Sequence, residues 1–172
     1  MIPRNLYDSD HEMFRDSVRK FIEVEAMPHH DQWEKDGMVS DEVWLKAGEQ
    51  GSLGLAVPEE YGGVNADFRY NCILNEEIAR SGCTGLGWTL HNDISVPYIV
   101  RYGSDFQKKK YLPRCASGEL ITAIAMTEPA AGSDLQGTKT TAVLDGDHYI
   151  LNGSKTFITC LLYTSPRPTR RR

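Results

Sequence analysis

MTEPAAGSD, at residues 126–134, places two hydroxyl side chains around a turn of small residues, directly after a short apolar run. Pro129 fixes the turn, and the Ala-Ala-Gly sequence at 130–132 keeps bulky side chains away from a closely approaching ligand. Thr127 and Ser133 supply the hydroxyls. Exposed backbone amides between hydroxyls suit a phosphate or the polar edge of a heterocycle. From spacing alone, an ordinary Pro-Gly loop explains these residues equally well.

Several common nucleotide-binding and hydrolase motifs are missing from the sequence. No G-x-G-x-x-G is present, and the GSKT at residues 153–156 lacks the glycine that precedes the lysine of a P-loop. No G-x-S-x-G nucleophile elbow is present either. The sequence therefore does not support a P-loop NTPase, a Rossmann enzyme or a hydrolase of the elbow type.

The composition is that of an ordinary globular protein. The 172 residues include 19 Lys+Arg and 24 Asp+Glu, for a net charge of -5, and 40% are hydrophobic. This balance predicts no nucleic-acid partner. The longest apolar run, residues 121–126, is far shorter than a membrane span, and residues 1–14 contain no apolar signal segment. We therefore expect a cytoplasmic protein with no membrane association.

The spacing of cysteines and histidines predicts no metal site. The four cysteines form no C-x-x-C pair and no ligand-spaced set with the five histidines, so reduced thiols are expected. His29 and His30 are adjacent in the chain and therefore point in different directions. A solvated helix exit explains this pair better than a metal site.

Apolar periodicity and capping residues predict that the first two thirds of the chain are helical. Ser9 and Glu12 form a capping-box pattern before a first helix, which Pro28 is expected to end. Further helices are expected behind Ser40, over residues 67–80 and 86–102, and from residue 104 onward.

The pattern changes after Gly118, where short segments rich in apolar residues predict strands over 120–126, 140–144 and 149–159. Asn152-Gly153 supplies the positive φ angles of a type I′ turn, so a hairpin is expected to close there. Helices followed by strands favour an α+β fold.

Several blocks, in the same order along the chain, resemble the acyl-CoA dehydrogenase family over residues 9–159, and most closely its long-chain and isovaleryl-type branches. The blocks are LGLAVPEEYGG at 53–63, NEEIARSG at 75–82, QKKKYLPRCASGEL at 107–120, AMTEPAAGSD at 125–134 and LNGSKTFIT at 151–159. The resemblance implies a helical N-terminal domain over residues 1–118 and a truncated, β-barrel-like, FAD-binding middle domain over 119–159.

The resemblance also implies where FAD binds. The backbone at Met126 and Thr127 is expected to face the isoalloxazine ring, and Gly132 and Ser133 to lie nearer the phosphates and the thioester. Ser133 is the implied substrate contact. The implied cofactor-binding residues are Ile124, Ala125, Met126, Thr127, Glu128, Pro129, Ala130, Ala131, Gly132, Ser133, Phe157, Ile158 and Thr159.

The second flavin segment contains an aromatic side chain and a hydroxyl two residues apart. Phe157 matches the family position that packs on the flavin ring, and Thr159 matches the position whose hydroxyl lies near the hydride-accepting nitrogen. Residues two apart share one face of a strand, so one ligand could contact both. A plain core role for Phe157 is the alternative.

The family reaction removes the α-proton of an acyl-CoA thioester with a glutamate, while the flavin accepts a hydride from the β-carbon. The family places that glutamate in a C-terminal helical domain, so no catalytic residue is assigned here, and a fragment ending near Thr159 is expected to be inactive alone. Glu128 belongs to the turn and is not assigned as the base. Residues 90–98 are expected to form part of the acyl pocket.

The family also implies partners and leaves alternatives. An acyl-CoA substrate, an electron-transfer flavoprotein as electron acceptor and a homotetramer of the full-length protein are expected. An acyl-CoA oxidase or flavin monooxygenase relative, and a noncatalytic binding fragment, stay open. Residues 160–172, CLLYTSPRPTRRR, match nothing in the family pattern and are expected to be a disordered or non-native tail.

Overall fold

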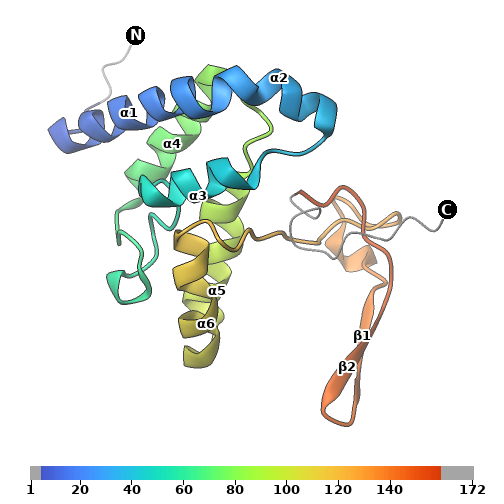
Figure 1. Ribbon diagram of the computed structural model, residues 1–172. Coiled ribbons are helices and arrows are strands. Elements are labelled where there is room, and N and C mark those ends of the chain that lie inside the picture. The colour runs from blue at the N-terminus through green and yellow to red at the C-terminus, as the bar shows by residue number, and fades with distance from the viewer. Residues whose placement is uncertain (1–4, 160–172) are drawn as a thin grey trace.

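The computed structural model describes residues 5–159, which form a helical part followed by an extended segment and a β-hairpin (Figure 1). Helices precede strands, so the predicted α+β class is confirmed. The expected tail at residues 160–172 lies outside the described residues. The elements are α1 (Ser9–Phe21), η1 (Ile22–Ala26), α2 (Met27–Asp36), α3 (Asp41–Glu49), η2 (Glu59–Tyr61), α4 (Phe68–Ser81), η3 (Leu90–Ser95), α5 (Val96–Tyr102), α6 (Asp105–Ala116), η4 (Leu135–Gly137), β1 (Thr141–Asp145) and β2 (His148–Asn152).

The cap of the first helix lies one residue earlier than predicted, at Asp8 instead of Ser9. The Asp8 carboxylate accepts a hydrogen bond from the His11 amide at 3.2 Å, and the His11 side chain reaches back to the Asp8 amide. The capping box predicted from Ser9 and Glu12 is wrong, because aspartate caps a helix as well as serine does.

Pro28 does not end the helical run. The π-helical turn η1 connects α1 to α2, and Pro28 lies in the first turn of α2. A proline is tolerated there because the missing N–H has no intrahelical partner in the first turn. The predicted end of the first helix is therefore wrong.

The other helix starts agree with the sequence. Ser40 caps α3, Asp67 caps α4, and Ser104 forms a capping box with Gln107 at the start of α6. The expected helix over residues 86–102 contains the π-helical turn η3 and then α5.

The main hydrophobic core lies among α1, α3, α4 and the turn before η3. Trp44 and Trp88 are both fully buried, with their rings edge to face at 6.4 Å between centroids. Burying a large apolar side chain stabilises the fold by roughly 1.5–3 kcal/mol. The helical part therefore has a core of its own.

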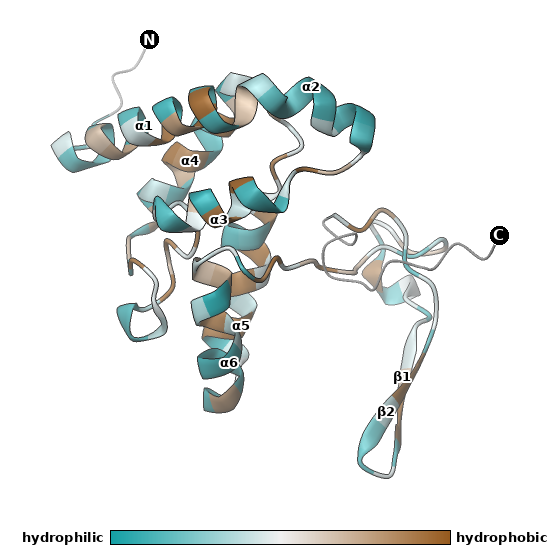
Figure 2. Cartoon of the chain, in the orientation of Figure 1, coloured by the Kyte–Doolittle hydropathy of each residue, from teal (hydrophilic) through white to brown (hydrophobic). Residues whose placement is uncertain are grey.

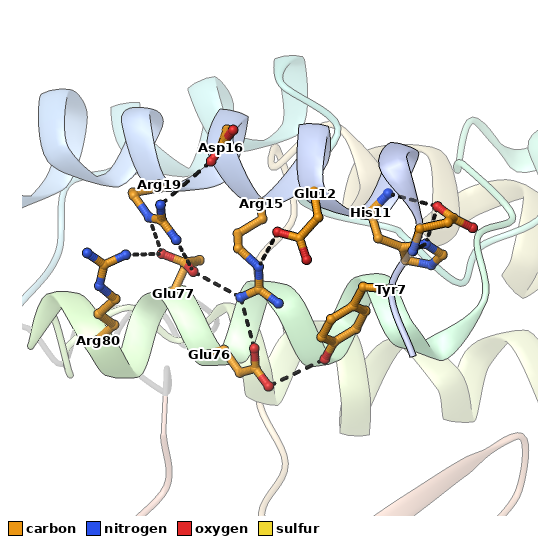
Figure 3. A network of polar contacts seen from close by, with 10 residues as sticks. Tyr7, His11, Glu12, Arg15, Asp16, Arg19, Glu76, Glu77 and Arg80 are labelled. Atoms are coloured by element: carbon orange, nitrogen blue, oxygen red, sulfur yellow. Dashed lines mark hydrogen bonds and ion pairs between the residues drawn. The ribbon is translucent and has the colours of Figure 1, made fainter. Parts of the chain in front are cut away.

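A polar network fixes how α1 lies against α4 (Figure 3). Glu77, whose side chain is 4% exposed, accepts hydrogen bonds from Arg15 at 3.0 Å and from Arg19 at 2.9 and 3.0 Å. Arg15 also donates to Glu76 at 2.9 Å. Burial alone would raise the pKa of Glu77, but the hydrogen bonds from Arg19 and Arg15 outweigh it and lower the pKa.

The hairpin closes six residues before the predicted turn. Antiparallel β1 and β2 pair Val143 with Ile150 and Asp145 with His148, which leaves Gly146 and Asp147 as a two-residue turn. Gly146 has a φ of +63°, the left-handed conformation that glycine adopts without strain. The turn predicted at Asn152-Gly153 is therefore wrong.

Gly153 has a different role, since the chain packs closely there. A Cβ atom at this position would lie 2.2 Å from the Thr140 hydroxyl oxygen. The glycine lets the segment after β2 pass beside the residue before β1.

Two predicted strand segments form no ladder in the described part of the chain. Residues 120–126 belong to no helix or strand, and the only bridge nearby joins Glu128 to Ala131. Residues 153–159 contain no strand. Strands need a paired neighbour, and the two-stranded sheet of residues 5–159 offers none to these segments.

The hairpin carries apolar side chains on an exposed surface. Figure 2 shows hydrophobic residues in both strands, which extend away from the helices. Val143, Leu144, Tyr149 and Leu151 are all more than half exposed. Among residues 5–159, no helix has the length and apolarity that crossing a membrane requires.

Candidate functional site

Glu128 anchors the segment MTEPAAGSD, here called the TEP loop (residues 126–134). Its carboxylate, 4% exposed, accepts hydrogen bonds from the Lys139 amide at 2.7 Å and the Thr140 amide at 3.1 Å. The Lys155 ammonium lies 2.8 Å away. These bonds, led by the one from Lys155, lower the pKa of Glu128 to about 2. The carboxylate is therefore charged and already bonded to three donors. These contacts argue against Glu128 as the base that abstracts the α-proton.

Two further contacts hold the second candidate segment beside the TEP loop. The Thr156 amide donates to the Thr127 carbonyl oxygen at 3.0 Å, and the Lys155 ammonium donates to the Met126 carbonyl oxygen at 3.1 Å. The structure therefore brings together the two segments that the sequence singled out.

The small residues of the TEP loop form a tight turn. Glu128 and Ala131 exchange backbone hydrogen bonds of 2.9 and 3.1 Å. Ala131 is 2% exposed and packs inward. The outer side of the turn is open: Pro129, Ala130, Gly132 and Ser133 are exposed. Before it, Ala125 and Met126 are exposed, and Ile124 and Thr127 are half-buried.

The second segment does not have the geometry expected of a strand. Phe157 has a φ of +55°, and its side chain is 94% exposed. Thr159 is exposed and Ile158 half-buried. The expectation that Phe157 and Thr159 share one strand face is wrong, because a left-handed residue breaks the alternation of a strand.

His91 connects the helical part to the segment that leads into the TEP loop. Its buried imidazole donates from Nε2 to the Cys115 carbonyl oxygen at 3.1 Å. Nδ1 accepts from the Thr122 amide at 3.3 Å and lies 2.9 Å from the Thr122 hydroxyl. Burial lowers the pKa of His91 to about 4, so the ring is neutral at pH 7.

A hollow of about 500 Å³ opens beside η3 and α5. Residues 92–94 and 96–98 contribute to its wall, so part of the segment expected to line the acyl pocket faces this space. Asp93 and Arg101 are its charged members. Within residues 5–159, no three His, Cys, Asp or Glu side chains are grouped to hold a metal ion.

Sequence reasoning missed Lys155 and His91. Lys155 belongs to the GSKT segment, which lies within the family block LNGSKTFIT, but no role was assigned to the lysine itself. His91 carries no local motif. Both act through contacts with residues about 30 positions away, which a pattern of neighbouring residues does not reveal.

A helical domain that leads into an anchored TEP loop and a β-hairpin defines a chain of the acyl-CoA dehydrogenase type. The family model described as acyl-CoA dehydrogenase, N-terminal domain, matches residues 8–119, and that of the middle domain matches residues 123–161. The chain belongs to the acyl-CoA dehydrogenase family.

Its relatives include long-chain and isovaleryl-CoA dehydrogenases. The chain is 54% identical to the mitochondrial long-chain specific acyl-CoA dehydrogenase of Sus scrofa, over 91% of this chain and 36% of that protein. This chain therefore spans little more than a third of that relative's length.

Solved structures agree in fold. The crystal structure of acyl-CoA dehydrogenase from Geobacillus kaustophilus superposes with a TM-score of 0.87 at 55% identity, over 91% of this chain and 41% of that one. The acyl-CoA dehydrogenase from Bacillus anthracis, complexed with FAD, superposes with a TM-score of 0.79 at 37% identity, over 91% and 28%.

Proposed function

We propose that this chain supplies the helical domain and the FAD-binding loop of an acyl-CoA dehydrogenase, which oxidises acyl-CoA thioesters between the α- and β-carbons in fatty acid metabolism. The carrying observation is the hydrogen bond from the Thr156 amide to the Thr127 carbonyl oxygen, which holds the two flavin segments together. Residues 1–118 are proposed as the helical domain and 119–159 as part of the middle domain.

The residues present fit a flavin. Gly132 and Ser133 are exposed and present backbone amides and a hydroxyl. The ring of Phe157, on the neighbouring segment, is exposed as well. Thr159 adds a second exposed hydroxyl. An aromatic ring beside hydrogen-bond donors suits a flat, polar-edged heterocycle. When bound, FAD supplies the hydride-accepting chemistry.

Each proposed contact has its own task. With FAD bound, the Thr127 backbone and the Thr159 hydroxyl would hydrogen-bond to the ring edge, and Phe157 would pack on the ring. Ser133 would donate its hydroxyl to the phosphates or the thioester. Ile124, Ala125, Met126, Pro129 and Ala130 form the rest of the surface, while Glu128, Ala131 and Ile158 hold it in place.

The proton-abstracting base is proposed to lie outside the two flavin segments. Glu128, the only carboxylate within them besides Asp134, is held by Lys155 and two backbone amides. A base must reach the α-proton from the face opposite the flavin. A polypeptide of these 172 residues alone is therefore proposed to bind flavin without turning over acyl-CoA.

The proposed partners follow from the family. They are an acyl-CoA thioester, an electron-transfer flavoprotein as acceptor, and further copies of the full-length chain in a homotetramer. The dehydrogenase names of the relatives favour this reading over an oxidase or monooxygenase. The cytoplasmic location stays a prediction; the Sus scrofa relative is named as mitochondrial.

Titration of the purified chain with FAD tests the proposal. Quenching of flavin fluorescence with a saturable, one-to-one isotherm is expected. A chain that leaves the fluorescence unchanged up to millimolar protein would contradict the assignment of the two segments.

A further inference from the structure

Lys155 lies between two acceptors on the TEP loop. Its ammonium nitrogen is 2.8 Å from Oε1 of Glu128 and 3.1 Å from the carbonyl oxygen of Met126, and its side chain is 25% exposed. A lysine ammonium has three donors and no acceptor, so these contacts occupy two of them. The side chain therefore spans from the segment after β2 to both ends of a three-residue stretch of the loop.

The next residue contributes a second connection. The Thr156 amide bonds to the Thr127 carbonyl oxygen, between the two positions that Lys155 contacts. One hydrogen bond lets two segments rotate about it, whereas contacts at three consecutive residues fix both their distance and their orientation.

The surroundings keep the lysine in place. The Glu128 carboxylate accepts hydrogen bonds from the amides of Lys139 and Thr140, which fix its position. Lys155 therefore bonds to an acceptor whose place in the fold is set by other contacts. The close approach of Gly153 to Thr140 brings the chain back to the loop two residues before Lys155.

We propose that Lys155 is a positioning residue of the flavin site: its ammonium group, held by Glu128 and the Met126 carbonyl oxygen, sets the position of Phe157 and Thr159 relative to the TEP loop. This inference rests on the proposed function. Lys155 itself does not need to contact the flavin, because it acts through the geometry of the two segments that do.

The experiment compares Lys155→Met, Lys155→Arg and Lys139→Met in the full 172-residue chain. Methionine keeps the length of the side chain and removes the charge, and arginine retains donors. Lys139→Met is the matched control, because the Lys139 side chain is exposed and only its backbone amide bonds to Glu128. Far-UV circular dichroism verifies that the helical domain is folded in each variant.

Two readouts are measured. Without flavin, the amide of Thr156 should exchange with deuterium roughly 10-fold faster in Lys155→Met and be unchanged in Lys139→Met. With FAD, the Kd from fluorescence quenching should rise roughly 10- to 100-fold in Lys155→Met, while Lys155→Arg recovers most of the affinity.

The two readouts distinguish a failure of flavin binding from a failure of the positioning role of Lys155. If the parent chain does not bind FAD, the proposed function fails, and the exchange of Thr156 alone decides whether Lys155 holds the segments together. If the parent binds FAD and Lys155→Met has the same Kd and the same Thr156 exchange, the positioning role is overturned while the flavin site stands.

Discussion

The imidazole Nδ1 of His91 lies 2.9 Å from the hydroxyl oxygen of Thr122 and accepts a hydrogen bond from the Thr122 amide at 3.3 Å. This pair joins a buried position on η3 to the extended segment four residues before the TEP loop. The contact requires a neutral ring, because a proton on Nδ1 would face the Thr122 amide hydrogen.

The stability of the chain should therefore fall as pH is lowered from about 6.5 to 4. The pKa of His91 is lowered to about 4 in the folded state by burial, and an unfolded histidine has a pKa of about 6.5. The unfolded state binds the proton first, so this stability is complete above about pH 6.5 and is lost as pH falls towards 4, by on the order of 3 kcal/mol.

Urea unfolding at a series of pH values measures this dependence. His91→Gln should lower stability at pH 7 and flatten the slope between pH 6.5 and 4.5. His148→Gln, at an exposed position in the hairpin, should leave the slope as in the parent. A parent chain whose unfolding free energy is constant over this window would contradict a buried neutral His91.

Glu77→Gln should destabilise the packing of α1 on α4. The variant leaves Arg15 and Arg19 without their shared carboxylate in a largely buried position, and the loss should be on the order of 1–3 kcal/mol. Asp16→Asn is the control, because Asp16 is 77% exposed and lies 3.6 Å from Arg19, so it should change stability by less than about 1 kcal/mol. The midpoints of urea unfolding measure both effects. If the two substitutions change stability equally, the network does not stabilise the packing of α1 on α4.

Thr159→Val should weaken FAD binding. If the hydroxyl meets a buried polar atom of the flavin, its loss should cost on the order of 1–3 kcal/mol, or roughly 5- to 150-fold in Kd. Thr138→Val changes an exposed threonine outside both segments and should have no effect. Equilibrium titration with FAD gives the Kd of each variant. An unchanged Kd for Thr159→Val would show that the Thr159 hydroxyl does not bind the flavin.

Gly146→Ala should loosen the hairpin, whereas Gly146→Asn should be better tolerated. At a φ of +63° a residue with a Cβ is strained, by about 1 kcal/mol, and asparagine enters this region more readily than alanine. Nothing lies within 4 Å of the added Cβ, so strain and not a clash is the cause. Amide exchange in β1 and β2 measures the effect; faster exchange with asparagine than with alanine would contradict it.

Local sequence determined most of the helical part. Ser40, Asp67 and Ser104 cap helices because a short polar side chain satisfies amides only two or three residues away, and such contacts are visible in the sequence. The errors at Asp8 and Pro28 arose because neighbouring residues offer equivalent caps and because a proline fits a first turn as readily as it ends a helix. The TEP loop and the segment LNGSKTFIT were likewise identified from sequence, through their resemblance to the family.

Tertiary structure alone decided how those segments meet. Gly146-Asp147 and Asn152-Gly153 both contain residues that hairpin turns favour, and the register that pairs Val143 with Ile150 places the turn at Gly146-Asp147. Glu128 could have been a base by residue type, but Lys139, Thr140 and Lys155 converge on it from positions 11, 12 and 27 residues further along the chain. Contacts between residues so far apart depend on the path of the backbone that connects them. No local sequence pattern therefore specifies that Lys155 donates to the Met126 carbonyl oxygen or that His91 bonds to Thr122.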